Sequence, residues 1–242
     1  MDGEDSLREV GYTIWENWYD GNGPCRHCPN RDEKGYFNPK NIDPGPESGD
    51  SNAEVVFVGM EPSDEIDGTS RKNLSVDEVP ESWSRRNRDP GFSNNRDGED
   101  TIREWLFYES DGKKRIDPIF DKKLEGSVYY TNSKKCANTG ERDELARCYC
   151  HDYLFSQLAA IEPTIIVPFG EKAVKSLSLR YFIPKYSKFS DVVVEVIGET
   201  QPHIIPSYHW SRPNFVSNIE RAGYESVPDY WVELVDEINA QL

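Results

Sequence analysis

The sequence predicts a three-layer α/β fold, in which helices cover both faces of a central, mostly parallel sheet. Short apolar runs at residues 54–58 and 164–168 are typical of strands that are buried on both faces. Helical patterns alternate with them, and the clearest spans residues 143–161. Its apolar positions recur at helical spacing, and a proline ends it: Leu145, Leu154, Leu158, Ile161 and Pro163. Strands that alternate with helices favour a parallel sheet.

The other expected elements follow along the chain. We expect a short docking helix at 10–19, a long loop at 64–100 and a helix at 101–108. Further strands are expected at 128–131, 191–197 and 203–206, and further helices at 171–179, 213–222 and 228–241. We divide the chain into an N-terminal segment, residues 1–50, that docks on a main domain, residues 51–242. Loops as long as 64–100 are usually functional or disordered in compact domains.

Length and composition limit the class of protein. A chain of 242 residues can bury one substantial core. Its apolar runs are too short to cross a bilayer, and its acidic, polar N-terminus is unlike a signal peptide. Five cysteines are an odd number, which argues against a closed disulfide framework and fits a reducing compartment. We therefore expect a cytoplasmic monomer without a membrane partner.

The charge is strongly acidic, with 44 Asp and Glu against 28 Lys and Arg and a net charge of −16. This balance disfavours nucleic acid as a partner, because affinity for DNA usually comes from basic side chains that displace counterions. Either the partner is not nucleic acid, or the protein works at molar salt, where the Debye length falls to about 3 Å. The composition resembles that of proteins from salt-in halophiles, which favours the second alternative.

Four cysteines form a candidate metal site. Cys25 and Cys28 are separated by two residues, a spacing that brings both thiols to one side of a tight turn. Cys136 and either Cys148 or Cys150 would complete the set from far along the chain. Four thiolates suit an iron–sulfur cluster or zinc equally well. Such a site would fasten the N-terminal segment to the main domain.

Candidate binding residues follow the ends of the predicted strands. Gly59, Asn132, Gly170 and residues 207–211 each come directly after a strand. In parallel sheets, ligands collect at the carboxyl ends of the strands. The sequence therefore predicts a ligand site at this edge of the sheet.

These segments together resemble a known family. They read Tyr-Tyr-Thr-Asn-Ser-Lys-Lys-Cys at 129–136, Cys-His-Asp-Tyr-Leu at 150–154, Gln-Leu at 157–158 and Tyr-His-Trp-Ser at 208–211. In this order, and after the Cys-x-x-Cys turn, they resemble the uracil-DNA glycosylase superfamily and most of all its iron–sulfur family 4. The resemblance spans roughly residues 20–220 and implies a [4Fe–4S] cluster held by Cys25, Cys28, Cys136 and Cys150. Cys150 is preferred to Cys148 because it stands in the family's Cys-x-x-Tyr-Leu register.

The resemblance also implies roles for individual residues. Asn132 would recognise uracil, since its amide can pair with O4 and N3–H, and His209 would contact O2 and stabilise the departing base. Gly59 would line the pocket, and Ser211 would contact phosphates beside a flipped nucleotide. Trp210 stands where the family has proline.

Two parts of the family pattern match less well. The family carries Glu directly after the glycine, whereas here Met60 takes that place and Glu61 follows, with Asp64 and Asp67 as further candidates to hold water. Phe92 is the candidate to stack on the base, and Arg85, Arg86 and Arg88 are candidates to meet phosphate.

The resemblance implies hydrolysis of the glycosidic bond of uracil in single- or double-stranded DNA. The alternatives are a damage-binding module that has lost catalysis and a glycosylase for another deaminated base, such as hypoxanthine.

Overall fold

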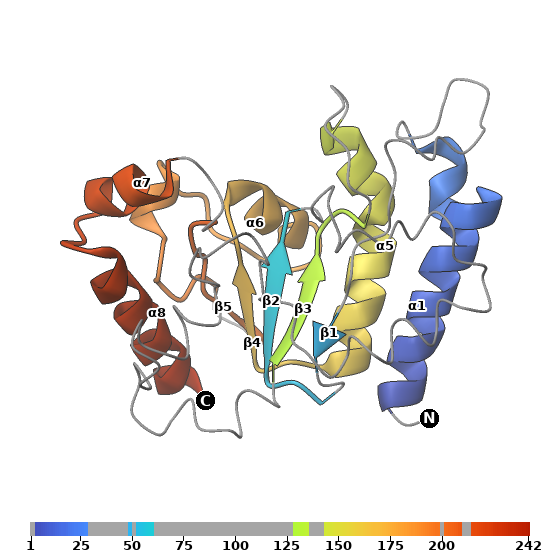
Figure 1. Cartoon of the computed structure of the whole chain (residues 1–242), viewed down its shortest axis with the longest axis horizontal. Coiled ribbons are helices and arrows are strands. Elements are labelled where there is room, and N and C mark those ends of the chain that lie inside the picture. The colour runs from blue at the N-terminus through green and yellow to red at the C-terminus, as the bar shows by residue number, and fades with distance from the viewer. Residues whose placement is uncertain are drawn as a thin grey trace, which may run out of the picture.

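The computed structural model describes residues 3–28, 48–49, 52–60, 128–135, 143–198, 201–209 and 214–242 (Figure 1). Its centre is a sheet of strand order β1-β3-β2-β4-β5. The strands are β1 (Ser48–Gly49), β2 (Val55–Gly59), β3 (Val128–Asn132), β4 (Ile165–Pro168) and β5 (His203–Ile204). All neighbours pair in parallel except β1, which is antiparallel to β3. The mostly parallel sheet predicted from the sequence is confirmed.

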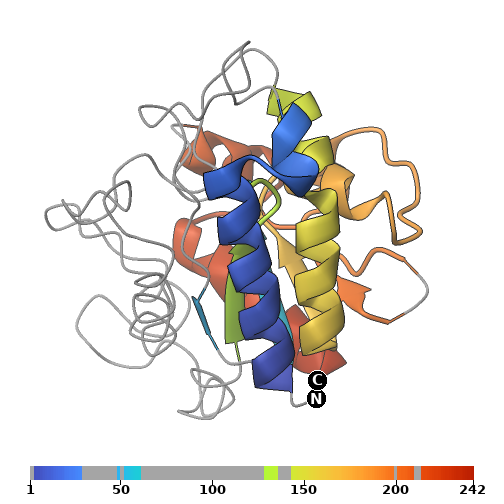
Figure 2. The ribbon, with the colours of Figure 1, turned by 90° about the vertical axis from the view of Figure 1, so that its right-hand side faces the viewer.

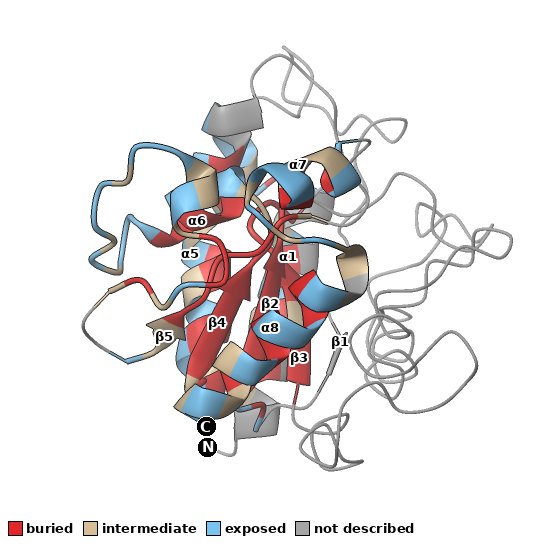
Figure 3. Cartoon of the chain, turned by 90° about the vertical axis from the view of Figure 1, so that its left-hand side faces the viewer, coloured by how far each residue is buried: buried red, intermediate tan, exposed pale blue. Residues whose placement is uncertain are grey.

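Helices cover both faces of this sheet. The helices α5 (Asp143–Ile161) and α6 (Glu171–Leu177) pack on Val56 and Val58 of β2. The other face, with Val55 and Phe57, packs on two further helices, α7 (Phe215–Arg221) and α8 (Val227–Gln241). The central strands β2, β3 and β4 are buried between these layers (Figure 3). The apolar runs read from the sequence thus form a sheet buried on both sides, and the three-layer prediction is confirmed.

The described helices of the N-terminal segment pack on the main domain. Helix α1 (Gly3–Asp20) runs beside α5 (Figure 2), and the short 3₁₀ helix η1 (Gly23–His27) contacts both. Leu7 of α1 is buried in the same apolar cluster as Leu154 and Leu158 of α5. The helix expected at 10–19 is therefore longer than predicted and begins seven residues earlier.

Two predictions from the apolar pattern are wrong. Residues 191–197 form turns after a short 3₁₀ helix, η4 (Phe189–Asp191), rather than a strand. Val193 and Val194 are both buried although they are adjacent, and Val194 has φ +66°, which no strand accommodates. Leu145 was expected on the apolar face of α5, but its side chain is 48 % exposed.

The helix expected at 101–108 and the loop expected at 64–100 lie outside the described residues. Within the described part of the chain, no helix combines the length and apolar character needed to cross a membrane.

Candidate active site

The carboxyl ends of four strands lie in one row. Asn132 is the partner of Gly59 in the register of β3 with β2, and Ser133 N–H donates to Gly59 C=O at 2.8 Å. On the other side of β2, Phe169 N–H donates to Val58 C=O at 2.8 Å. Ser207 continues the row, since it bridges Phe169 and its N–H donates to Pro168 C=O at 2.9 Å. The residues predicted to follow the strand ends are thus neighbours across the sheet.

Asn132 is held in a compact polar corner. Its side chain is 3 % exposed, and the Tyr130 hydroxyl donates to Asn132 Oδ1 at 3.3 Å. A Cβ at Gly59 would overlap both Tyr130 Oη and Asn132 Oδ1, so a side chain there would displace the amide. An amide oxygen has two lone pairs, so Oδ1 can accept a further hydrogen bond from a ligand. Gly59 therefore makes room for the amide.

His209 lies at the opposite end of the row. Its ring meets Phe169 edge-on, with centroids 6.2 Å apart, and Phe169 stacks on Phe57 at 5.6 Å with an interplanar angle of 10°. Phe57 and Phe169 are fully buried, as expected for Phe57 from its place in the strand. His209 itself is half-buried. The two aromatic rings thus form an apolar support beneath the imidazole.

The backbone that leads into His209 is fixed by a closed hydrogen-bond circuit. Tyr208 N–H donates to Tyr230 Oη at 2.8 Å, and Tyr230 Oη lies 2.6 Å from Ser207 Oγ. Ser207 Oγ in turn donates to Tyr208 C=O at 3.2 Å, so the Tyr230 hydroxyl must be the donor to Ser207. The circuit holds the peptide planes on both sides of Tyr208, and the second of these planes ends at the nitrogen of His209. Tyr230 of α8 is therefore the anchor of this loop.

The turns at 191–197 support the same loop. Val194 N–H donates to Pro206 C=O at 2.8 Å, and Phe189 packs edge-on against Tyr208 with centroids 5.5 Å apart. The left-handed conformation of Val194 costs a β-branched residue on the order of 1–2 kcal/mol. The surrounding packing maintains this conformation, which directs the Val194 N–H toward the loop.

A buried lysine supports the Asn132 side. Lys135 is 3 % exposed, and its Nζ donates to Thr131 Oγ1 at 2.6 Å and to Gln157 Oε1. Thr131 Oγ1 also donates to Gln157 Oε1 at 2.9 Å, which closes a triangle between the end of β3 and α5. A buried ammonium requires such partners, because an unpaired one would be strongly destabilising. The triangle fixes β3 at the residue before Asn132.

Three of the four predicted metal ligands lie on two elements that contact each other, η1 with its C-cap residue and α5. Cys28 and Cys150 are buried and Cys25 is half-buried, whereas Cys148 is exposed. Cys28 N–H donates to Cys25 C=O at 3.2 Å within the tight turn, and Cys25 Sγ lies 3.7 Å from the Tyr153 hydroxyl on α5. Burial first, and then the charges of the Cys25 and Cys28 thiolates, raise the pKa of Cys150 to about 12.

The surroundings of Cys150 suit a thiolate that ligates a metal. Lys135 N–H donates to Cys150 Sγ at 3.5 Å, a contact that stabilises a ligating thiolate. Cys136 is bonded directly to Lys135 but lies outside the described residues. Within the described ranges, no three Cys, His, Asp or Glu side chains are close enough together to hold a metal ion.

Other predicted site residues also lie outside the described part of the chain. These are Glu61, Asp64, Asp67, Arg85, Arg86, Arg88, Phe92, Trp210 and Ser211. Met60 is described: it is 8 % exposed, and its C=O accepts from Ser133 Oγ at 2.9 Å and from Lys134 N–H at 3.0 Å. Met60 Sδ would lie 3.6 Å from a Cβ at Gly170. An apolar, buried side chain thus stands where the family carries its acid.

Sequence reasoning did not assign roles to Lys135, Gln157 and Tyr230. Lys135 and Gln157 stand inside segments that carried the resemblance, so their presence in these motifs was a usable signal. Tyr230 had no such signal, because its partners precede it by more than 20 residues.

Comparison with known proteins agrees with this arrangement. No curated protein matches the chain. A family model described as the uracil DNA glycosylase superfamily matches residues 46–231, which include all five strands and the helices α5, α6 and α7. The chain belongs to the uracil-DNA glycosylase superfamily.

Proposed function

We propose that this protein hydrolyses the N-glycosidic bond between uracil and deoxyribose in DNA. Membership of the superfamily supports a glycosylase acting on DNA in general. The donor and acceptor of the Asn132 amide complement the O4 and N3–H edge of uracil. The observation that carries the proposal is the row of strand ends with Asn132 at one end and His209 at the other. A base between them would have its polar edge toward an amide and a second oxygen near an imidazole.

In this proposal Asn132 selects the base. Uracil presents a carbonyl at O4 and an N–H at N3, and a carboxamide offers the complementary donor and acceptor. The hydroxyl of Tyr130 holds Asn132 Oδ1, so the amide is oriented before a nucleotide enters. Recognition of a base by this edge requires that the nucleotide leave the helical stack.

His209 assists departure of the base. When the bond between C1′ and N1 breaks, its electron pair remains on uracil, and the negative charge spreads to O2. A hydrogen bond from His209 to O2 is stronger to this anion than to neutral uracil, so it accelerates the reaction. Water bonds to C1′, and its proton completes the hydrolysis on N1 of the released base.

Glu61 is the candidate to orient the attacking water. Because Met60 is buried and apolar, it supplies no carboxylate, and the acid nearest in sequence is Glu61. Because Met60 replaces the acid of the family pattern, two alternatives to uracil excision stay open. One is a damage-binding module without catalysis, and the other is excision of hypoxanthine.

Substitutions at the two ends of the row test the proposal. Asn132→Asp replaces a donor with an acceptor and should weaken selection of uracil by roughly 1–3 kcal/mol. His209→Ala should lower kcat by roughly 10²–10³-fold and leave binding of uracil-containing DNA nearly unchanged. His203→Ala, on β5 outside the row, is the matched control and should retain activity.

The measurement is release of uracil or hypoxanthine from single- and double-stranded oligonucleotides, from low to molar potassium chloride. Glu61→Ala shows whether the acid serves the water, because a large loss of rate would then follow. If the wild-type protein binds uracil DNA but releases no base at any salt concentration, the binding-module alternative holds instead.

We propose further that Cys25, Cys28, Cys136 and Cys150 hold a [4Fe–4S] cluster, with zinc as the alternative. The packing of η1 against α5, which carry Cys25 and Cys150, and the Lys135 N–H bond to Cys150 Sγ support this assignment. When bound, the cluster supplies metal–thiolate bonds that fasten η1 to α5, and no redox step is required for hydrolysis.

Metal analysis after anaerobic purification tests the assignment. Cys150→Ser should deplete the protein of iron, whereas Cys148→Ser, the matched control two residues away on the exposed side, should retain it. Stoichiometric zinc without iron would favour the alternative metal.

The acidic composition supports function at high salt. Screening of acidic self-repulsion should increase both stability and activity as potassium chloride rises toward molar concentration. Highest activity at low salt, with a steep loss above it, would contradict this part of the proposal.

A further inference from the structure

One stretch of this acidic chain is basic throughout. Residues 172–190 contain five of the 28 Lys and Arg residues and none of the 44 Asp and Glu residues. The five are Lys172, Lys175, Arg180, Lys185 and Lys188. All five are exposed. A protein with a net charge of −16 thus presents a local positive surface, here called the basic stretch.

The basic stretch begins at the candidate active site. Gly170 N–H donates to Ser207 C=O at 2.7 Å, and α6 begins at the next residue. The stretch therefore leaves the row of strand ends through α6 and continues past it. It then lies against α5, where the Arg180 guanidinium stands 5.6 Å from the centre of the Phe155 ring.

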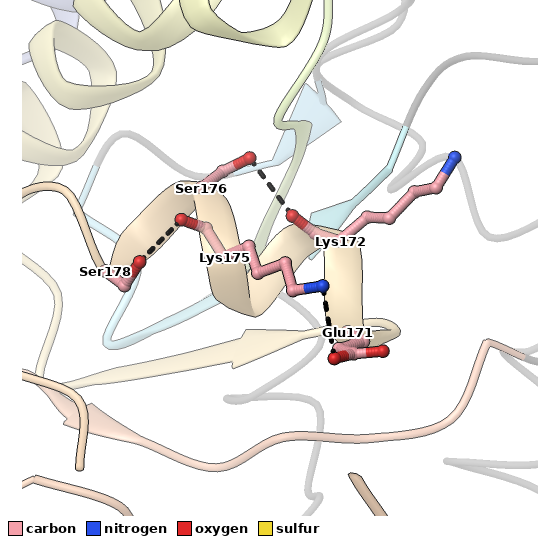
Figure 4. A network of polar contacts seen from close by, with 5 residues as sticks. All are labelled: Glu171, Lys172, Lys175, Ser176 and Ser178. Carbon is pink, nitrogen blue, oxygen red and sulfur yellow. Dashed lines mark hydrogen bonds and ion pairs between the residues drawn. The ribbon is translucent and has the colours of Figure 1, made fainter. Parts of the chain in front are cut away.

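The side chains of α6 diverge. Figure 4 shows the Lys175 ammonium beside the Glu171 carboxylate, 3.2 Å away, while Lys172 extends away from this pair. An exposed ion pair of this kind contributes little to stability, typically 0–1 kcal/mol, so Lys175 can exchange it for another anion at small cost. The long side chains of Lys172 and Lys175 can therefore each contact a phosphate of a nearby DNA strand.

Apolar side chains are exposed within the same stretch. Leu179 is 61 % exposed and Phe182 is 76 % exposed. Surfaces that bind single strands combine basic groups that track the backbone with aromatic faces on which bases stack. The stretch ends at Asp191, which with Glu195 and Glu233 lines an acidic hollow of about 300 Å³. Phosphate would be repelled from that side, so the favourable path lies along the basic stretch.

We propose that residues 172–188 bind the DNA backbone beside the base pocket. This inference rests on the proposed function, because it assigns a path to the strand from which the base is taken. The partner is a DNA strand, recognised by the charge complementarity between its phosphates and the exposed lysines and arginine. Such a basic surface would give a strongly acidic chain a place at which a polyanion can bind.

Binding of fluorescent, uracil-free oligonucleotides, measured by anisotropy from 0.1 to 1 M potassium chloride, tests the proposal. Arg180→Gln combined with Lys185→Gln removes two positive charges. If each contacts a phosphate, affinity should fall roughly ten- to fifty-fold at 0.1 M salt. The slope of log affinity against log salt should become shallower by about 1.4–1.8.

The matched control is Val232→Glu with Ala240→Glu, which changes the net charge by the same amount. Both residues are exposed and lie on α8, on the opposite face of the sheet from α6. Equal effects of the two double variants would overturn the proposal, since only net charge would then matter. Undamaged DNA keeps the test independent of catalysis: a protein that excises no uracil still reports on this surface. A variant that loses uracil excision but still binds DNA would count against the role of the basic stretch and would point to an effect on the proposed reaction.

Discussion

The two ends of the strand-end row are held by different chemistry. On the His209 side, neutral groups form the Tyr230 circuit, and an apolar cluster of sheet and helix side chains surrounds it. On the Asn132 side, a buried ammonium holds β3 to α5, and the N–H of the same lysine donates to the buried thiol of Cys150. Removal of a neutral group from the Tyr230 circuit leaves neutral hydrogen-bonding groups without a partner. Removal of a partner of the ammonium leaves a buried charge without one, and this lowers the free energy of unfolding more. The Asn132 side should therefore be the more sensitive to substitution.

The largest effect is expected at Gln157. Gln157→Leu removes the acceptor shared by Lys135 and Thr131, and should lower the free energy of unfolding by about 3 kcal/mol. Gln157→Glu keeps an acceptor and adds a complementary charge, so it is the matched control and should be far less destabilising. Urea denaturation measures both. Equal losses in the two variants would show that the Lys135 ammonium does not depend on this acceptor.

A smaller effect is expected at Tyr230. Tyr230→Phe keeps the buried ring but opens the circuit, and should cost about 1 kcal/mol of stability. If the circuit orients His209, kcat should fall several-fold with KM unchanged. Tyr224→Phe is the control, because the Tyr224 hydroxyl contacts the exposed carboxylate of Glu233 and is separate from the loop. Unchanged kcat in Tyr230→Phe would restrict the circuit to a role in stability.

The smallest effect concerns alkaline pH. Burial raises the pKa of Tyr230 well above its usual value near 10, so its hydroxyl stays protonated in the folded state. Below pH 10 both states hold the proton and stability is unaffected. Above pH 10 the unfolded state releases the proton, so stability falls, by about 0.8 kcal/mol at pH 10.5.

Denaturation curves at pH 9 and 10.5 measure this loss. Tyr230→Phe should lack this component, and the wild-type and variant proteins should then differ less at pH 10.5 than at pH 9. A constant difference between them would contradict the assignment to Tyr230.

The local pattern of apolar residues correctly predicted the elements that are buried along their whole length or that carry a long helical period. Residues 55–58 are buried on every side, and 143–161 carry a long helical periodicity, so both were predicted within one residue. The Val-rich run at 192–196 looked equally strand-like, but Val194 turns to bond Pro206 and the run forms turns. The apolar composition therefore predicted correctly that Val193 and Val194 are buried, but it did not predict their backbone conformation.

The geometry of the candidate site could be predicted only in part, for the same reason. Asn132 and Gly59 were identified because they directly follow buried strands, and the sheet register brings them together. Lys135 stands in a motif that carried the resemblance, but its burial between Thr131 and Gln157 was not predicted, because that burial depends on the packing of β3 against α5. Contacts between distant segments, such as Tyr230 with Ser207, are set by the fold as a whole.

The packing of α1 on α5 has a consequence for synthesis on the ribosome. Helix α1 is complete about 140 residues before α5, the helix that buries its apolar face. At roughly 5–20 residues per second, Leu7 and its neighbours wait roughly 7–28 s for Leu154 and Leu158 to be made. During this interval the first helix exposes an apolar face without its final partner. Slow translation between the two helices would prolong this stage, in which Leu7 lacks its final apolar partners.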